Sequence, residues 1–534
     1  MRARVCVPIH VEDIDAALAD ANQAKLLGAD CVEFRIDGFF PGCESDAEDA
    51  HRLEQLRRLL AGSSLPVILT CRIAEEGGNY DGDEADRVAL LQKICIESDH
   101  PPAYLDFELS SYQNSANIRQ KINLCVDHPN QQRDVRTRLI LSMHDFHGRP
   151  ANLMRQVANA WAEPAASIVK FAFRARSIRD NLEIFEILRE TPKPTIGLGM
   201  GEFGLMSRVL ATKFGGFLTF ASLRDTSATA PGQPTIAELF GLYRFRSIGK
   251  ESKVCGIMGW PVAHSMSPLI HNAGFEARGA DTVYLPMPVA DGYESFKASA
   301  YALLDAQHLD LTGVSVTIPH KEHLARFAAE AGWKIDPSAA DCNAANTACF
   351  GSRVCITNTD GPAACDCLED RLKSLEGRLI SILGAGGVAR AIASSVKQRG
   401  GTVRIVNRTH ERAIQLASDL GPGVEAIGLE HLSEHTSDAY INCTPVGMTG
   451  GPDPEGLSIP VRELADTLPP ETLFFDTVYN PIETPMIKTA RHHGFCTIDG
   501  VEMFVKQAAA QFALWTGEQA PIQLFDRLVR EKLS

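Results

Sequence analysis

The chain has 534 residues, and its 52 Lys and Arg against 67 Asp and Glu give a formal net charge of -15 at pH 7. This length is too great for one ordinary hydrophobic core and suggests about three domains, while the negative charge repels polyanions and argues against nucleic acid as a partner. No apolar run approaches the roughly 18 to 20 residues of a membrane span, the N-terminal stretch MRARVCVPIHVEDID lacks the features of a signal or transit peptide, and 14 cysteines without a C-x-x-C pair suit a reducing compartment, so we expect a soluble cytoplasmic protein.

The first part of the chain, residues 1–245, alternates short apolar runs with amphipathic stretches of helical period. Eight strands separated by helices predict an α/β fold, a closed (β/α)8 TIM barrel. An open doubly wound sheet is the structural alternative. The eight runs are RVCVPIH, CVEFRID, PVILTCRI, AYLDFEL, RLILSMHD, SIVKFAF, PTIGLGM and FLTFAS.

Residues 241–253, GLYRFRSIGKESK, are polar and without a clear apolar period, so they are predicted to join two domains. Strand and helix patterns restart after them with VCGIMG, GVSVTIPH, ANTACF and VCITNTDG. We predict a first α/β lobe at 254–360, completed by the helical tail 490–534. Between them, 361–489 contains the order strand, glycine turn, helix, strand in RLISILGAGGVARAIASSV and TVRIVNRT, which predicts a Rossmann nucleotide-binding lobe.

Polar residues gather at the ends of the predicted barrel strands, where barrel enzymes carry their chemistry. Lys170 lies inside the apolar run SIVKFAF. A lysine in such a run most often snorkels to solvent, but an apolar pocket with arginine cations nearby would favour the uncharged amine, which is a nucleophile. The other polar residues at this end are Glu33, Arg35, Arg72, Glu76, His144, Arg208 and Gln233.

The stretches VEFRID, CRIAEEGG, MHDF, VKFAF, GMGEFGLMSR and TAPGQ resemble type I 3-dehydroquinate dehydratase, in the family's order. The resemblance implies that Lys170 forms a Schiff base with the substrate ketone. It further implies that His144 is the general acid and base and that Glu76 orients His144. Arg208 would pair with the substrate carboxylate. The residues implied to bind the substrate hydroxyls and shape the pocket are Glu33, Arg35, Arg72, Thr229 and Gln233.

Thr229 and the histidine pair His144 and His147 are two further features of this half. Thr229 stands in TAPGQ where the family usually has serine, which keeps the hydroxyl and adds a methyl group. His144 and His147 in HDFH could suggest a metal, but no third ligand of suitable spacing accompanies them, so we expect no metal.

The turn GAGGVA, residues 384–389, matches the G-x-G-x-x-A dinucleotide fingerprint between an apolar strand and a helix. Such a turn admits a pyrophosphate to the free N–H groups of the helix N-terminus. The next strand ends in Asn407, Arg408 and Thr409 rather than in the acid typical of NAD sites. Because Arg408 can pair with a 2'-phosphate, the sequence favours NADP.

Residues 254–534 resemble shikimate dehydrogenase in GWPVAHSMSPLIHN, VSVTIPHK, ANTA, NTDG, GAGGVARA, NRT, NCTPVGM, DTVYNPIETP and DGVEMFVKQAAAQF. The resemblance implies that Lys321 and Asp360 are the catalytic pair, which would stabilise and protonate the ketone oxygen when hydride arrives. The implied substrate contacts are Ser265, Ser267, Thr317, Asn346, Tyr479 and Gln507. The implied cofactor contacts are Gly384, Ala385, Gly386, Gly387, Val388, Ala389, Asn407, Arg408, Thr409, Thr444, Met448 and Gly500.

Together the two resemblances predict a bifunctional lyase and oxidoreductase of the shikimate pathway. It would dehydrate 3-dehydroquinate to 3-dehydroshikimate and reduce the latter to shikimate with NADPH, so its partners would be these small molecules. Ser267 and Thr317 favour shikimate over quinate as the second product. A catabolic quinate or shikimate dehydrogenase and a catalytically silent metabolite sensor are the alternatives, and a pure sensor need not keep Lys170, His144 and Lys321.

Overall fold

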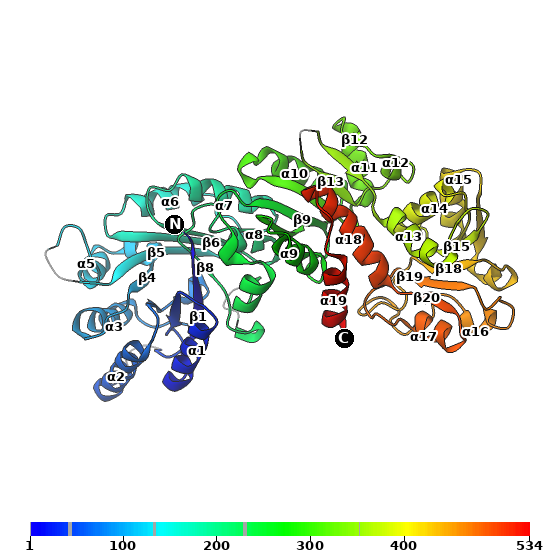
Figure 1. The fold of residues 1–534 in the computed structure, drawn as a ribbon. Coiled ribbons are helices and arrows are strands. Elements are labelled where there is room, and N and C mark those ends of the chain that lie inside the picture. The colour runs from blue at the N-terminus through cyan, green and yellow to red at the C-terminus, as the bar shows by residue number, and fades with distance from the viewer. Residues whose placement is uncertain (1, 41–44, 132–134, 228–231, 352) are drawn as a thin grey trace. The chain divides into compact units, whose positions relative to one another are not determined.

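The computed structural model describes residues 2–40, 45–131, 135–227, 232–351 and 353–534. The chain divides into two compact units, Met1–Ser252 and Lys253–Ser534 (Figure 1). Among the described residues, no helix is both long and apolar enough to cross a membrane.

The first unit is a parallel β-barrel. Its sheet has the order β7-β6-β5-β4-β3-β2-β1-β8. The two ends of this order meet where Phe217 N donates to Thr195 O at 2.8 Å. The predicted barrel is therefore confirmed, and the open doubly wound sheet does not form. The strands are β1 Arg4–His10, β2 Cys31–Arg35, β3 Val67–Thr70, β4 Tyr104–Glu108, β5 Arg138–Asp145, β6 Ala166–Arg174, β7 Thr195–Met200 and β8 Leu218–Phe220.

Helices follow most of these strands and cover the outside of the barrel. Asp13 and Ser115 are two of the N-cap residues whose side chains accept the first free backbone N–H groups. Alternate residues of β6 turn inward, so Ile168 and Ala172 belong to the apolar interior of the barrel and Lys170 lies between them. The helices are α1 Ile14–Leu26, α2 Asp46–Gly62, α3 Glu84–Glu97, α4 Leu109–Asn114, α5 Ala116–Cys125, α6 Leu153–Ala162, α7 Arg179–Arg189 and α8 Leu205–Val209.

The segment after β8 stays on the barrel as far as Ser252. Tyr243, Phe245 and Ile248 are buried. Lys213 Nζ donates to the carbonyl oxygens of Lys250 and Ser252, both at 2.8 Å. The stretch predicted as a polar linker is thus largely part of the first unit, because its few apolar side chains find a place in the core.

The second unit contains two six-stranded sheets. The first has the order β10-β9-β11-β13-β14-β12, and in it β13 runs antiparallel to both neighbours. Its strands are β9 Lys253–Gly259, β10 Thr282–Pro288, β11 Leu311–Val316, β12 Lys334–Ile335, β13 Thr347–Cys349 and β14 Cys355–Thr357. Its helices are α9 Ser267–Ala277, α10 Tyr293–Asp305, α11 Lys321–Glu330 and α12 Pro337–Ala340.

The second sheet is wholly parallel, with the order β17-β16-β15-β18-β19-β20. This is the doubly wound order of a Rossmann fold, with its switch point between β15 and β18. Its strands are β15 Leu379–Leu383, β16 Thr402–Asn407, β17 Val424–Gly428, β18 Ala439–Asn442, β19 Leu473–Asp476 and β20 Cys496–Ile498. Its helices are α13 Asp360–Leu372, α14 Gly387–Gln398, α15 His410–Leu420, α16 Val461–Leu464 and α17 Pro485–His492.

The tail forms α18 Gly500–Thr516 and α19 Ile522–Leu533 (Figure 1). Phe512 and Phe525 from these helices share a buried cluster with Cys255, Phe275 and Tyr284 from the first sheet and its helix α9. The C-terminal residues therefore complete the core beside the first sheet of this unit.

Candidate active sites

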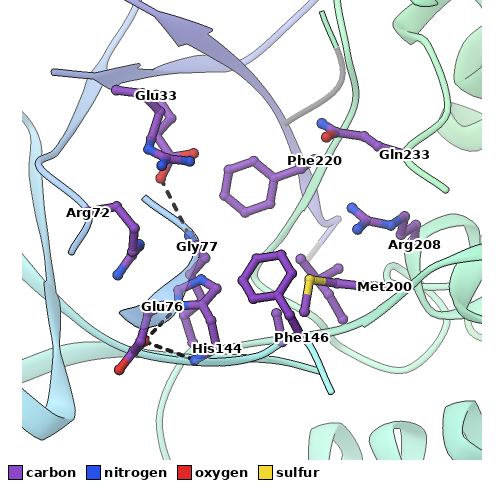
Figure 2. Close-up of a pocket in the computed structure, with 14 residues that line it drawn as sticks. Glu33, Arg72, Glu76, Gly77, His144, Phe146, Met200, Arg208, Phe220 and Gln233 are labelled. Atoms are coloured by element: carbon purple, nitrogen blue, oxygen red, sulfur yellow. Dashed lines mark hydrogen bonds and ion pairs between the residues drawn. The ribbon is translucent and has the colours of Figure 1, made fainter. Parts of the chain in front are cut away.

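A pocket opens in the barrel unit at the carboxyl ends of the strands (Figure 2). Residues from β2, β5 and β6 line it, together with residues from the loops and helices after β3, β7 and β8. Thr229 lies outside the described residues. The other predicted residues of this site all line the pocket: Glu33, Arg35, Arg72, Glu76, His144, Lys170, Arg208 and Gln233.

Lys170 lines this pocket and is buried, with 5% of its surface exposed. Its Nζ lies 3.0 Å from Asp106 Oδ2 and 3.4 Å from Glu33 Oε1, and 4.6 Å from the centre of the Phe220 ring. The amine therefore does not snorkel to solvent. It is buried and paired with two carboxylates.

The sequence interpretation did not place these carboxylates beside Lys170. We expected arginine cations near the amine, and Arg35, Arg72 and Arg208 line the same pocket, but the groups in contact with Nζ are two anions. Only an uncharged amine attacks a carbonyl.

Arg72 is held by internal partners. Its Nη2 donates to Asp106 Oδ1 at 2.7 Å, and its Nη1 donates to Glu108 Oε1 at 2.9 Å and to Ser142 Oγ at 2.8 Å. Burial acts to raise the pKa of Asp106, but Arg72 and Lys170 outweigh it and hold that pKa well below its usual range. Arg72 thus neutralises the buried carboxylates beside Lys170.

His144 and Glu76 form a hydrogen-bonded pair on one side of the pocket (Figure 2). Glu76 Oε2 lies 3.0 Å from both the backbone N and the Nδ1 of His144. Burial, followed by the charges of Arg72 and Lys170, holds the pKa of His144 well below its usual value. The imidazole is therefore neutral, and with Nδ1–H directed at the carboxylate its Nε2 is left as a base.

Arg208 lies across the pocket from Arg72 and Glu76 (Figure 2). It is 2% exposed, and its Nε has no hydrogen-bond partner among the described residues. Burial lowers the pKa of Arg208 to about 10. A buried guanidinium costs free energy unless an anion pairs with it, so this side chain fits the carboxylate of a ligand.

A second cavity, of about 170 Å³, lies in the other unit near the ends of β11 and β14 and the start of α18. Lys321 and Asp360 meet there, with Nζ 2.6 Å from Oδ2. All the substrate contacts predicted for this half line the same cavity: Ser265, Ser267, Thr317, Asn346, Tyr479 and Gln507.

A buried network fixes the amide of Asn346 in this cavity. Its Oδ1 accepts from Thr347 Oγ1 at 2.7 Å and from Thr359 N at 2.9 Å, and its Nδ2 donates to Thr359 Oγ1 at 2.9 Å. Gln511 supports the network, since its Nε2 donates to Thr347 Oγ1 at 2.9 Å. One N–H of Asn346 is left over from these contacts, so the side chain suits a hydroxyl or carbonyl oxygen.

The glycine turn after β15 has the form of a phosphate cradle. Gly384 has φ +114°, which favours glycine, and a Cβ at Gly386 would meet nothing within 4 Å. Helix α14 begins directly after Gly386 without a side-chain cap, so its first N–H groups are free. The open space in front of uncapped N–H groups fits a pyrophosphate. Val388 and Gly500 line the neighbouring substrate cavity.

The other residues predicted to bind the nucleotide lie around this turn in different roles. Arg408 is exposed at the end of β16, beside Asn407, whose Nδ2 donates to Thr409 O at 2.8 Å. Ala389 is fully buried in the core under α14, which suits the close helix packing of the third fingerprint position rather than ligand contact. Thr444 Oγ1 donates to Asn442 Oδ1 at 2.6 Å. The remaining predicted positions are Ala385, Gly387 and Met448.

The sequence interpretation missed several residues that shape the two sites. Asp106 and Glu108 hold Lys170 and Arg72, Asp37 holds Arg35 through two hydrogen bonds, and Gln511 braces Asn346. A signal existed for two of them, because Asp106 and Glu108 are charges within the apolar run AYLDFEL, as Lys170 is in SIVKFAF. Among the described residues, no group of three or more His, Cys, Asp or Glu side chains could hold a metal ion.

Family models match both units. Residues 5–250 match the type I 3-dehydroquinase family. Residues 257–348 match the shikimate dehydrogenase substrate binding domain, 366–448 match the shikimate / quinate 5-dehydrogenase family, and 500–530 match the shikimate 5'-dehydrogenase C-terminal domain.

Curated relatives match the whole chain or its second half. A chloroplastic bifunctional 3-dehydroquinate dehydratase/shikimate dehydrogenase of Arabidopsis thaliana is 35% identical over 98% of this chain and 83% of its own length. The shikimate biosynthesis protein AroDE of Chlamydia pneumoniae is 30% identical over 81% of this chain and 82% of its own. An NADP(+) shikimate dehydrogenase of Methanocella arvoryzae is 37% identical over 52% of this chain and 99% of its own. The chain belongs to the family of bifunctional 3-dehydroquinate dehydratase/shikimate dehydrogenases.

Proposed function

We propose that the chain catalyses two consecutive reactions, the dehydration of 3-dehydroquinate in the barrel unit and the NADPH-dependent reduction of 3-dehydroshikimate in the second unit. The observation that carries the proposal is the arrangement of the barrel pocket. A buried lysine lines the same pocket as a neutral histidine paired with a glutamate and an arginine whose Nε has no partner among the described residues. These three groups match the parts of a cyclic keto acid. The lysine can attack its ketone, the histidine can remove the proton of its acidic C–H bond, and the arginine can pair with its carboxylate.

In the first step, Nζ of Lys170 attacks the ketone carbon, and the ketone oxygen leaves as water when the imine forms. Arg208 holds the substrate carboxylate at the opposite side of the pocket and so directs the ketone toward Lys170. The covalent bond turns a ketone into a cationic iminium, which is a much stronger electron sink.

In the second step, Nε2 of His144 removes a proton from the carbon beside the iminium. The electron pair moves toward the iminium nitrogen and then expels the neighbouring hydroxyl group. His144 returns its proton to that hydroxyl, which leaves as water. Hydrolysis of the remaining imine releases 3-dehydroshikimate and restores the amine of Lys170 and the neutral imidazole.

In the second unit, a bound NADPH supplies a hydride to the ketone carbon of 3-dehydroshikimate. Negative charge then develops on the ketone oxygen. Lys321 stabilises this oxygen and delivers its proton, while Asp360 holds the ammonium in place. Hydroxyl and amide side chains such as Ser267, Thr317 and Asn346 hold the substrate through its hydroxyl groups.

The nucleotide would bind with its pyrophosphate at Gly386 and the N-terminus of α14. Arg408 would pair with the 2'-phosphate and so select NADP over NAD. We further place the lobe boundaries of this unit at 254–360 with 490–534, and at 361–489. The cytoplasm remains our proposed location, although the Arabidopsis relative is named chloroplastic.

The test uses full-length Lys170→Ala and Lys321→Ala variants with each intermediate and NADPH. Lys170→Ala should reduce 3-dehydroshikimate at the wild-type rate and leave 3-dehydroquinate unchanged. Lys321→Ala should convert 3-dehydroquinate to 3-dehydroshikimate and oxidise no NADPH. A wild-type chain that binds both ligands without turnover would support the sensor instead, and oxidation of quinate with NAD at a higher rate than shikimate with NADP would support the catabolic enzyme.

A further inference from the structure

A second hollow lies behind the pair of His144 and Glu76 in the barrel unit. Its volume is about 210 Å³, against about 50 Å³ for the substrate pocket, so it has room for several water molecules. Glu76, His144 and Ala172 line both cavities, whereas Lys170 and Arg208 line the substrate pocket alone. The acid–base pair therefore forms a wall between the two cavities.

Ser110, on α4, holds the far side of Glu76. Its Oγ donates to Glu76 Oε1 at 2.9 Å, while the other carboxylate oxygen of Glu76, Oε2, is hydrogen-bonded to His144. Ser110 lines the hollow and takes no part in the substrate pocket. Glu76 Oε2 is thus paired with His144, and Oε1 is paired with a residue of the hollow.

The hollow is open to solvent. Gln113 and Asn152 at its edge are exposed, Gln156 is half-buried, and Ser110 itself is exposed. The His144 side chain is only 9% exposed, and a bound substrate would cover the pocket side of its ring. Water can therefore reach Glu76 from behind while the substrate pocket is full.

We propose that Ser110 is a positioning residue of the dehydratase site, whose hydrogen bond to Oε1 holds the Glu76 carboxylate in place for its pair with His144. The inference rests on the proposed dehydratase function.

The charges around Glu76 make this hydrogen bond important for the ionisation of its carboxyl group. Burial raises the pKa of Glu76 to about 7, with Glu108 adding to the effect and Arg72 opposing it. The hydrogen bond from Ser110 lowers that pKa. Asp145, which also lines the hollow, already accepts from two backbone N–H groups.

The role of Ser110 is tested by the pH profile of dehydratase kcat. Without its hydrogen bond the carboxylate of Glu76 is less stable, so Ser110→Ala should move the acid limb to higher pH by about half a unit. Ser110→Thr should restore the profile. Ser111→Ala is the matched control, because Ser111 lies on the same helix but contacts Arg87 instead of Glu76, and it should leave the profile unchanged.

The two possible failures can be told apart. An acid limb that stays in place in Ser110→Ala, or moves equally in Ser111→Ala, would contradict the positioning role while dehydration itself continues. A wild-type protein that does not dehydrate 3-dehydroquinate at all would refute the proposed function instead. Dehydrogenase activity of each variant, measured on 3-dehydroshikimate, shows that the chain is folded.

Discussion

Lys321 Nζ lies 2.6 Å from Asp360 Oδ2, and each of these residues is the first of its helix, α11 and α13. The ammonium and the carboxylate are both nearly buried, with 13% and 8% of their side chains exposed. Because Lys321 and Asp360 begin two helices that meet at one cavity, their ion pair holds the lysine, the proton donor, in a fixed position. The partner carboxylate holds the lysine side chain at the cavity.

Lys321→Met should remove this proton donor with little change in shape. We expect dehydrogenase kcat to fall by about 10²- to 10⁴-fold, the usual contribution of a positioned acid. Dehydration of 3-dehydroquinate by the same protein should not change. Lys297→Met is the matched control, because Lys297 also pairs with a carboxylate, Glu330 at 2.7 Å, but on the surface. NADPH oxidation measures both, and equal losses in the two variants would contradict the assignment.

Arg208 and Arg72 should respond to the same substitution in opposite ways. Arg208→Met removes a buried charge for which the described part of the chain provides no carboxylate partner, so the midpoint of thermal unfolding should rise. The KM for 3-dehydroquinate should rise by about 100-fold, because the substrate carboxylate loses its partner.

Arg72→Met removes one of the two cations from each of two buried carboxylates, and leaves Asp106 with Lys170 and Glu108 with Arg87. It should therefore lower the free energy of unfolding by about 3 to 5 kcal/mol. Thermal unfolding of both variants, beside the wild type, checks the pair of expectations. Destabilisation by Arg208→Met would show that its guanidinium has a structural partner.

Glu76→Gln should stabilise the protein at high pH and inactivate the dehydratase. Burial raises the pKa of Glu76 from 4.5 to about 7, so the native state binds the proton more tightly than the unfolded chain. Stability from this group is complete below pH 4.5 and is lost as the pH rises through 7. At pH 8.5 the loss is on the order of 3 kcal/mol.

The glutamine variant cannot ionise, so it avoids this loss. Urea unfolding of wild type and variant should agree near pH 4.5 and diverge at pH 8.5, with the variant more stable. The transition to follow is the one that coincides with the loss of ligand binding by the barrel. A difference that is the same at both pH values would mean that ionisation of Glu76 is not its cause.

Arg408→Ala should change cofactor choice and little else. The side chain is exposed, so the folded state should keep its stability. We expect kcat/KM for NADPH to fall by about 10- to 100-fold, since one charged partner of the 2'-phosphate is lost. The value for NADH should stay the same. A parallel fall with both cofactors would place Arg408 outside the 2'-phosphate site.

The sequence predicted the barrel well because each strand is a short apolar run bounded by polar residues. The residues that it predicted at strand ends also line the barrel pocket, apart from Thr229, which lies outside the described residues. The strands that it missed have weaker patterns: β10 contains Pro286 and Pro288, β20 has three residues, and the edge strand β17 carries Glu425.

Contacts across the sites could not be predicted from the sequence in the same way. The pairing of Lys170 with Asp106 depends on the register and tilt of β4, β5 and β6, which bring together side chains 64 residues apart. Ser110 meets Glu76 only because α4 starts beside the turn after β3, and neither stretch alone indicates this. The contacts of Lys170 with carboxylates were missed for the same reason, since charge in a site depends on packing.

The central claim is that Lys170 bonds covalently to a keto acid. The most direct test is borohydride reduction of the full-length protein mixed with 3-dehydroquinate, followed by mass spectrometry of its peptides. We predict a mass increment of the reduced adduct on the peptide that contains Lys170, and none on Lys213, which is equally buried but donates to backbone carbonyls. An unmodified Lys170 peptide, or an increment that persists in Lys170→Ala, would contradict the account.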